Sequence, residues 1–208
     1  MSPQFHPTLV VVGPPGAGKS TVGKVLARRL DVGFVDTDDL IVERIGKSVA
    51  EMFVQEGEPA FRALEREIVA DALRDTSGVL ALGGGSVLAA ETRERLRGHR
   101  VVSLTLSLAD GIRRTGMSTA RPLLAGVNPR ATFKALLDAR GPLYAEVATF
   151  EVDTGRRSAN QVARAVLIAL GELPADAPPD PVVPGDPLDV PTTGESTLLP
   201  APTMSQQG

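Results

Sequence analysis

The sequence predicts an α/β fold in which helices cover both faces of a parallel sheet. Five short apolar segments alternate along the chain with segments of helical periodicity. This alternation is typical of parallel sheets, because each crossover between parallel strands is long enough to hold a helix. Such crossovers are right-handed. A glycine-rich loop between the first strand and the first helix supports the same interpretation.

The composition fits a small globular protein and excludes several kinds of site. A length of 208 residues suggests one domain, with or without an appendage, and 42% hydrophobic residues are enough for a core. Only 3% of the residues are aromatic and tryptophan is absent, so this core must be aliphatic. The chain has no cysteine, which excludes disulfides, cysteine zinc sites and cysteine nucleophiles.

Charge and hydropathy indicate small-molecule partners. The formal net charge of −3 gives no basic footprint for nucleic acid. No window approaches the ~20 apolar residues that a membrane helix needs. The first residues also lack the basic and apolar regions of a signal peptide. We therefore expect a cytoplasmic protein, a monomer, that binds neither nucleic acid nor membranes.

The glycine-rich loop, GPPGAGKS at residues 13–20, matches the pattern G-x-x-x-x-G-K-[ST]. It follows the apolar segment Leu9–Val12 and opens a helical pattern that continues to Leu30, which is the context that the pattern requires. Glycines lack a Cβ, so successive N–H groups can point at one anion, and the helix N-terminus adds a partial positive charge. Lys19 can reach the β- and γ-phosphates of a nucleotide, and the Ser20 hydroxyl can bind Mg²⁺.

Two aspartates follow the second predicted strand, which ends at Asp36. Ligands of open parallel sheets bind beyond the carboxyl ends of the strands. Asp36 can therefore belong to the coordination shell of Mg²⁺, and Asp38 can face an incoming hydroxyl. An aspartate-rich turn that caps a helix explains the same pair equally well from these residues alone.

The next region predicts helices separated by a break. Residues 40–45 predict a short helix that Gly46 stops, and the sequence SVAE at residues 48–51 is a capping box for another short helix through Phe53. Residues 57–59, Gly-Glu-Pro, interrupt the pattern before a strong helix over residues 60–73.

Apolar residues of that longer helix, including Phe61 and Ile68, fall near helical spacing and belong to the core. Arg62 points elsewhere, either at a site or, as is more common, into solvent. A short buried strand over residues 79–82 then leads into Gly83, Gly84 and Gly85, where backbone N–H groups can come close to a ligand.

The second half of the folded region repeats the alternation. We expect a helix over residues 89–96, a strand over 100–106 and a helix that begins after Ser107 and ends near Thr115. Residues 116–129 form a long loop that contains Arg121. Long loops in compact domains are lids or disordered segments. An arginine on a lid suits phosphoryl transfer, because the transferred group spreads negative charge over its oxygens.

The last elements are a helix from Pro129 to about Arg140, a strand over residues 149–153 and a helix that Ser158 caps and that ends at Leu170. From Pro174 the composition changes: the tail contains about half of the chain's 17 prolines, several acidic residues and no lysine or arginine. It lacks the apolar content to offset its ordering entropy. We expect a folded domain over residues 1–173 and a disordered tail over 174–208.

The order and spacing of these motifs resemble shikimate kinase. The motifs that carry the resemblance are residues 13–20, Asp36-Thr37-Asp38, Phe61-Arg62-x-x-Glu65, Leu82-Gly83-Gly84-Gly85, Arg121-Pro122-Leu123-Leu124, Arg140-x-x-Leu143-Tyr144 and residues 153–157. The resemblance covers residues 9–170 or so. It implies the three-layer P-loop fold of the nucleoside-monophosphate-kinase type, with strand order 2-3-1-4-5 and a lid. It also implies ATP-dependent phosphorylation of the 3-hydroxyl of shikimate, with one Mg²⁺, in chorismate and aromatic amino-acid biosynthesis.

The resemblance also implies a role for each site residue. Catalysis would rest on Asp38, Lys19 and Arg121. ATP would contact Gly16, Ala17, Gly18, Lys19, Ser20, Thr21, Arg121 and, on the adenine side, Arg157. Shikimate would contact Asp38, Arg62, Arg140, Gly83, Gly84 and Gly85, with Glu65 orienting Arg62 and with Phe53 and Phe61 as walls. Ser20 and Asp36 would serve the magnesium ion.

Three other functions compete with this interpretation. The nearest is a gluconate kinase or nucleoside monophosphate kinase on the same fold, although Arg62, Arg140 and the three glycines favour an acid as acceptor. A nucleotide-binding switch without phosphoryl transfer is another, although the chain has no N-K-x-D motif for guanine. The third is a non-catalytic member of the family.

Overall fold

The structure is a computed structural model that describes residues 7–115 and 128–178. The strands are β1 (Leu9–Val12), β2 (Phe34–Asp36), β3 (Val79–Ala81), β4 (Val101–Thr105) and β5 (Phe150–Asp153). The helices are α1 (Lys19–Leu30), α2 (Thr37–Ile45), α3 (Val49–Asp75), the 3₁₀ turn η1 (Ser86–Leu88), α4 (Ala90–Leu96), α5 (Leu108–Thr115), α6 (Pro129–Val147) and α7 (Ala159–Leu170).

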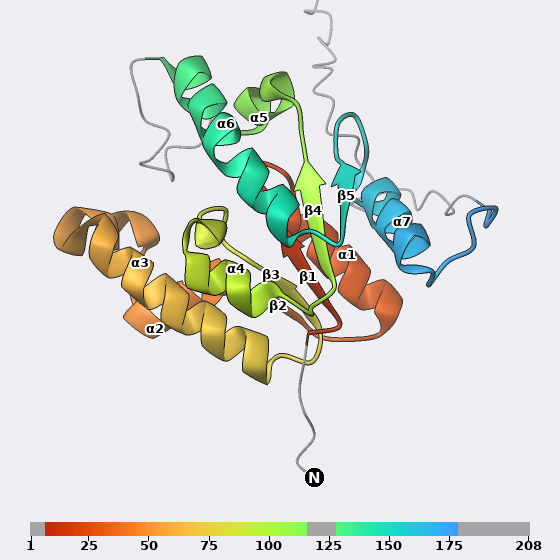
Figure 1. The fold of residues 1–208 in the computed structure, drawn as a ribbon, viewed down its shortest axis with the longest axis horizontal. Helices are drawn as coiled ribbons and strands as arrows, with labels where there is room; N and C mark the ends of the chain where they lie inside the picture. The colour runs from red at the N-terminus through yellow and green to blue at the C-terminus, as the bar shows by residue number, and fades with distance from the viewer. Residues whose placement is uncertain (1–6, 116–127, 179–208) are drawn as a thin grey trace, which may run out of the picture.

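The five strands form one parallel sheet in the order β2-β3-β1-β4-β5, which confirms the expected order (Figure 1). The central strand β1 pairs with β3 on one side, where Val10 lies opposite Leu80, and with β4 on the other, where Val10 lies opposite Val101. The connection after β1 therefore leaves from the middle of the sheet's carboxyl edge, where open α/β sheets bind ligands.

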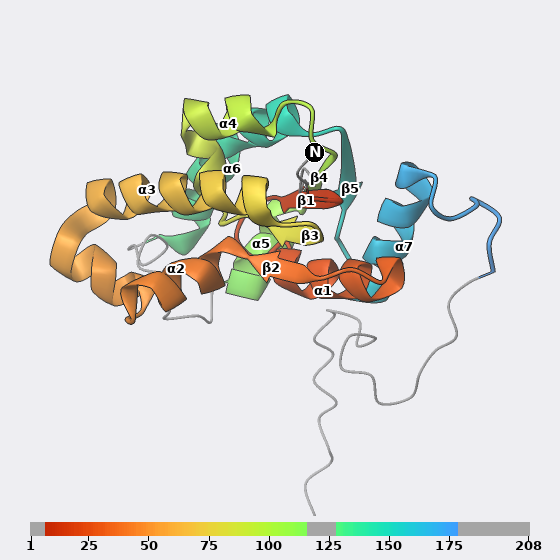
Figure 2. The same ribbon diagram turned by 90° about the horizontal axis from the view of Figure 1, so that it is seen from below.

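Alternate residues of β1 face opposite layers. Leu9 and Val11 pack with α1 and α7, whereas Val10 and Val12 pack with α3, α4 and α6, and all four are fully buried. Figure 2 shows α1 along one face of the sheet and α3 and α4 along the other. A strand that is buried on both faces has a continuous run of apolar residues, and the sequence LVVV of β1 is such a run.

The helices α2 and α3 share a smaller cluster of their own. Ile41 of α2 packs with Met52, Phe61 and Ile68 of α3, all nearly inaccessible to solvent. In Figure 1 this helix pair extends to one side of the sheet. The expected break lies at Gly57, whose φ of 82° and ψ of 169° are not helical, so α3 is two helical segments joined at this glycine.

Two helix boundaries differ from the sequence expectation. Helix α2 begins at Thr37 rather than at residue 40, because the Asp36 side chain accepts a hydrogen bond from the Asp38 backbone N–H and caps the helix. Helix α6 continues to Val147, so the predicted end near Arg140 is wrong. Proline lacks an N–H and usually ends a helix, but α6 passes through Pro142 because Tyr144 beyond it is packed in the core.

The remaining boundaries agree with the sequence within a few residues. Ser107 accepts a hydrogen bond from the Asp110 N–H at the start of α5, and Ser158 forms a capping box with Gln161 at the start of α7. The loop with Arg121, except for its last two residues, lies outside the described residues, as does the tail beyond residue 178. Within the described ranges, no helix is both long and apolar enough to cross a membrane.

Candidate active site

The glycine-rich loop joins β1 to α1 and has a backbone that only glycine adopts easily. Gly16 and Gly18 have φ values of 80° and 86°, and a Cβ on Gly13 would overlap the carbonyl of Leu104. Gly18 is the N-cap of α1 and makes no side-chain cap hydrogen bond. The first N–H groups of α1 can therefore donate hydrogen bonds to an anion, as they do at other helix N-termini that bind phosphate.

Ser20 and Asp36 meet at the start of α1. The Ser20 hydroxyl donates to Asp36 Oδ2 at 2.5 Å, and Asp36 as a residue is 9% exposed. The other Asp36 oxygen accepts from the Asp38 N–H at 3.0 Å. Of the two interpretations left open by the sequence, the helix cap is confirmed, and the same carboxylate also lies beside the loop hydroxyl. Lys19 extends back along the loop, where its Nζ donates to the Pro14 carbonyl at 3.3 Å.

The three glycines after β3 let charged side chains and the phosphate loop converge. A Cβ on Gly83 would lie 2.5 Å from Asp38 Oδ1 and 3.0 Å from Glu65 Oε1. A Cβ on Gly84 would contact the phosphate loop, 3.5 Å from the Gly13 oxygen, and one on Gly85 would overlap the Arg62 guanidinium. The turn therefore brings α2, α3 and the phosphate loop together.

Arg62 lies in a network of carboxylates. Its NH1 donates to Glu65 Oε2 at 2.6 Å, and its Nε and NH2 donate to Glu58 Oε1, both at 3.2 Å. Glu65 is 3% exposed and its other oxygen accepts from the Ser86 hydroxyl at 2.9 Å. The Arg62 guanidinium also stacks over Phe61, at 5.2 Å from the ring centre. These contacts fix the direction of a guanidinium whose side chain is only 17% exposed.

The aromatic residues and Arg140 complete the region around the turn. The rings of Phe53 and Phe61 lie 4.7 Å apart between their centroids. Arg140 of α6 donates from NH1 to the Gly84 carbonyl at 2.9 Å, and the Tyr144 hydroxyl donates to the same oxygen at 2.6 Å. The structure thus brings together the predicted residues Asp38, Arg62, Glu65, Phe53, Phe61, Arg140 and the three glycines.

Sequence reasoning missed several residues that hold this site together. Arg114, at the end of α5, donates to the Gly16 carbonyl at 3.2 Å and to the Thr154 hydroxyl and carbonyl at 3.0 and 2.8 Å. Burial lowers the pKa of Arg114 below its ordinary value. In the sequence, Arg114 follows another arginine on a short helix and resembles a solvated charge. Only the folded chain shows that it ties the phosphate loop to the connection between β5 and α7, where the exposed Arg157 lies.

Glu58, Ser86 and Thr37 were missed as well. Thr37 accepts from the Gly83 N–H at 2.9 Å, so the residue between the two aspartates anchors the turn. In the sequence, only the position of Thr37 within Asp-Thr-Asp marked it, and that motif drew attention to the two aspartates instead. Arg121 lies outside the described residues.

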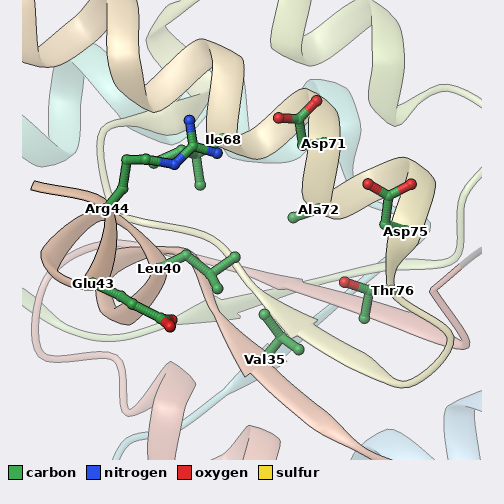
Figure 3. A pocket seen from close by; sticks show the side chains of 9 residues that line it. All are labelled: Val35, Leu40, Glu43, Arg44, Ile68, Asp71, Ala72, Asp75 and Thr76. Atoms are coloured by element: carbon green, nitrogen blue, oxygen red, sulfur yellow. The ribbon is translucent and has the colours of Figure 1, made fainter.

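A separate pocket of about 560 Å³ lies between β2, α2 and the C-terminal part of α3 (Figure 3). Val35, Leu40, Ile68 and Ala72 supply apolar surface, and Glu43, Arg44, Asp71, Asp75 and Thr76 are its polar residues. None of the predicted site residues lines it.

Comparisons with known proteins agree with the geometry. The family model described as shikimate kinase matches residues 15–171. A shikimate kinase of Saccharopolyspora erythraea is 65% identical over 150 residues, which are 72% of this chain and 86% of that protein. A shikimate kinase of Rhodococcus jostii is 51% identical over 166 residues, 80% of this chain and 99% of the relative.

A solved structure supports the same assignment at the level of the fold. The shikimate kinase of Acinetobacter baumannii, in complex with shikimate, superimposes with a TM-score of 0.77 at 35% identity. The superposition covers 81% of this chain and 94% of that one. Together with a family model that spans most of the folded region, these likenesses leave one conclusion: the chain belongs to the shikimate kinase family.

Proposed function

We propose that this chain transfers the γ-phosphoryl group of ATP to the 3-hydroxyl of shikimate, which gives shikimate 3-phosphate and ADP. The reaction is a step of chorismate and aromatic amino-acid biosynthesis. One observation carries the proposal: the Gly83–Gly85 turn lies between the phosphate loop and the arginines that suit an acidic acceptor. A Cβ on Gly84 would contact the loop, and its carbonyl accepts from Arg140.

The acceptor's carboxylate binds to Arg62 and Arg140. A planar guanidinium can bind a carboxylate through two parallel hydrogen bonds, which an ammonium group cannot do. Glu65 and Glu58 hold Arg62 from one side, and the Gly84 carbonyl holds Arg140. Both arginines are therefore oriented before the acceptor binds, and Phe53 and Phe61 form the wall beside Arg62.

The reacting hydroxyl binds to Asp38, whose carboxylate lies against Gly83 at the carboxyl edge of the sheet. Asp38 orients this hydroxyl and accepts its proton as phosphoryl transfer proceeds. A loose transition state needs positioning and positive charge more than it needs a strong base. The main role of Asp38 is therefore to orient the reacting hydroxyl.

The phosphates of ATP bind to the N–H groups of residues 16–21 and to Lys19. Arg121, from the loop before α6, supplies positive charge to the transferred group, and Arg157 lies along the adenine side. Arg114 supports this half of the site through Gly16 and Thr154. Closing the site over both substrates excludes water, and the exclusion of water protects ATP from hydrolysis.

One Mg²⁺ accompanies ATP in this proposal. The residues present fit the ion, because the Ser20 hydroxyl and the Asp36 carboxylate lie 2.5 Å apart beside the loop and are the hard oxygen ligands that Mg²⁺ prefers. The bound ion would neutralise charge on the β- and γ-phosphates.

We further propose that the protein acts in the cytoplasm as a monomer without nucleic-acid partners, and that the folded domain ends near residue 173. The tail over 174–208 would be a passive extension. Its first residues, up to 178, are described, and there Arg164 donates to the backbone oxygens of Ala177 and Pro178.

The decisive experiment measures ADP release by the purified full-length protein from ATP and Mg²⁺. Shikimate, gluconate, AMP and no acceptor are compared in parallel, with Lys19→Met as the inactive control. We expect turnover with shikimate only, and its loss when Mg²⁺ is chelated. Turnover with gluconate or AMP would reject the acceptor. ATP binding without any turnover would favour a non-catalytic member of the family.

A further inference from the structure

The carbonyl of Gly84 accepts two side-chain hydrogen bonds from one helix. Arg140 NH1 donates at 2.9 Å and the Tyr144 hydroxyl at 2.6 Å. The two residues are four apart on α6, so both side chains lie on the same face of the helix. A carbonyl oxygen has two lone pairs and can accept both donors at once. Arg140, Tyr144 and the turn therefore form one connected unit.

The Tyr144 hydroxyl lies in a buried and highly charged environment. The residue is 4% exposed, and burial raises the pKa of its hydroxyl to about 12, although the charge of Arg140 and a hydrogen bond with it oppose the rise. The charges of Glu65 and Arg62 also act on this pKa, in opposite directions. The hydroxyl thus lies among the groups assigned to the acceptor and remains a hydrogen-bond donor at physiological pH.

We infer that Tyr144 is a positioning residue for acceptor binding: its hydroxyl fixes the Gly84 carbonyl and, through it, the direction of the Arg140 guanidinium. The inference rests on the proposed function only in that Arg140 binds the acceptor's carboxylate. Tyr144 acts through Arg140 and does not touch the reacting atoms.

The mechanism follows from the connectivity of the turn. Gly83 is held from one side by Thr37, which accepts its N–H at 2.9 Å, and Gly84 is held from the other by Arg140 and Tyr144. Without the hydroxyl, Arg140 alone would hold the Gly84 carbonyl. The peptide could then follow the flexible arginine instead of orienting it, and the guanidinium would lose its fixed direction toward the acceptor.

A purely structural tyrosine is the competing explanation. The Tyr144 ring packs in the core cluster with Val10 and Leu80, and its hydroxyl could serve only to satisfy a buried carbonyl. A structural role would lower stability and affect both substrates alike. A positioning role would act on the acceptor alone, and its effect would depend on Arg140.

Tyr144→Phe separates these explanations, because phenylalanine keeps the ring and removes only the hydroxyl. We expect the KM for shikimate to rise about tenfold, which is the effect of weakening one hydrogen bond between Arg140 and the acceptor's carboxylate. The KM for ATP should change by less than about twofold, which is a smaller change than the loss of one typical hydrogen bond would cause. Thr149→Val is the matched control: it removes a hydroxyl that accepts from the Val101 N–H at 3.1 Å, outside this unit, and it should leave both KM values unchanged.

A double-mutant cycle with Arg140→Met tests the dependence on Arg140. Values of kcat/KM are taken from the linear range at low shikimate, so weak binding does not prevent the measurement. We expect Tyr144→Phe to lower kcat/KM by less than about twofold when Arg140 is already replaced, because coupled residues are not additive. The inference would be overturned if Tyr144→Phe lowered kcat/KM equally with and without Arg140. It would also be overturned if Tyr144→Phe raised the KM for ATP as much as the KM for shikimate. If the wild-type protein does not phosphorylate shikimate, the proposed function fails first, and the two failures are thus distinguishable.

Discussion

The two halves of the site are built in different ways. On the proposed nucleotide side, one contiguous loop supplies most of the binding groups, chiefly backbone N–H groups whose direction follows from glycine φ values. On the acceptor side, the side chains of Asp38, Arg62 and Arg140 come from α2, α3 and α6 and meet only at the Gly83–Gly85 turn. The nucleotide half is thus mostly local in sequence, apart from distant residues such as Arg114 that support the loop, whereas the acceptor half depends on the tertiary structure.

This contrast has a consequence for substitutions. Changes on the nucleotide side should affect the chemical step, because charge develops on the phosphoryl group. Changes on the acceptor side should mainly affect the KM for shikimate, since they alter how the acid is held. The following predictions test this division.

The largest effect is expected for Arg121→Ala. Loss of an arginine that stabilises the transferred phosphoryl group lowers kcat by about 10³-fold or more in related chemistry. Steady-state kinetics with saturating ATP and shikimate measure the change. Arg130→Ala, which removes an exposed arginine from the first turn of α6, is the control and should keep kcat. A decrease of less than about tenfold would remove this role from Arg121.

Arg62→Lys should raise the KM for shikimate by about 100-fold, because lysine keeps the charge but loses the two-pronged hydrogen bonding. The KM for ATP should remain close to that of the wild type. Arg66→Lys, one turn further along α3 and exposed, changes a residue that pairs with Glu91 at 3.6 Å and serves as control. Similar KM values for both variants would show that Arg62 does not bind the acceptor.

Gly85→Ala should raise the KM for shikimate by about tenfold and also lower stability, because Arg62 is displaced from the buried Glu65 carboxylate. Its φ of −104° suits any residue, so the substitution creates no backbone strain. The new Cβ overlaps the flexible end of Arg62, which must move. Gly33→Ala, where a Cβ meets nothing within 4 Å, is the control. Thermal unfolding and the two KM values are compared; a rise in the KM of ATP alone would contradict the proposed division of the site.

The smallest effect concerns pH. The pKa of Tyr144 is raised by burial from 10.0 to about 12, so the unfolded chain loses this proton first as pH rises. The contribution of the buried phenol to stability is complete below pH 10 and is lost as pH rises toward 12. Because the chain has one tyrosine and no tryptophan, tyrosinate absorbance reports this group directly.

Denaturant unfolding on either side of pH 10 supplies the matching measurement. The wild type should lose more stability across that range than Tyr144→Phe, which has no phenol to ionise. An absorbance midpoint near pH 10 in the folded protein would show that the hydroxyl is not buried as described.

The sequence predicted those parts of the molecule whose structure is determined locally. The apolar run before the phosphate loop, the capping box at Ser48, the helix cap at Ser158 and the break at Gly57 depend on neighbouring residues, and all are observed. The end of α6 was predicted wrongly, because packing of Tyr144 outweighs the cost of Pro142, and packing is not visible in the sequence.

The same reason explains which site residues were found. The resemblance identified Arg140 and Arg62 with its partner Glu65, but it gave no role to Glu58, Ser86 and Tyr144, which contact Arg62, Glu65 and the Gly84 carbonyl respectively. Arg114 was missed because its partners, Gly16 and Thr154, are far away in sequence. Long-range pairs of this kind leave no periodic signal.

The small core shared by α2 and α3 has a consequence for evolution and engineering. Its residues Ile41, Met52, Phe61 and Ile68 form a cluster distinct from the two that flank the sheet. This helix pair carries Asp38, Phe53 and Arg62, while the phosphate loop belongs to the sheet. Under the proposed function, redesign of the acceptor side would therefore start from this helix pair, which carries Asp38 and Arg62, and would have to include Arg140 of α6.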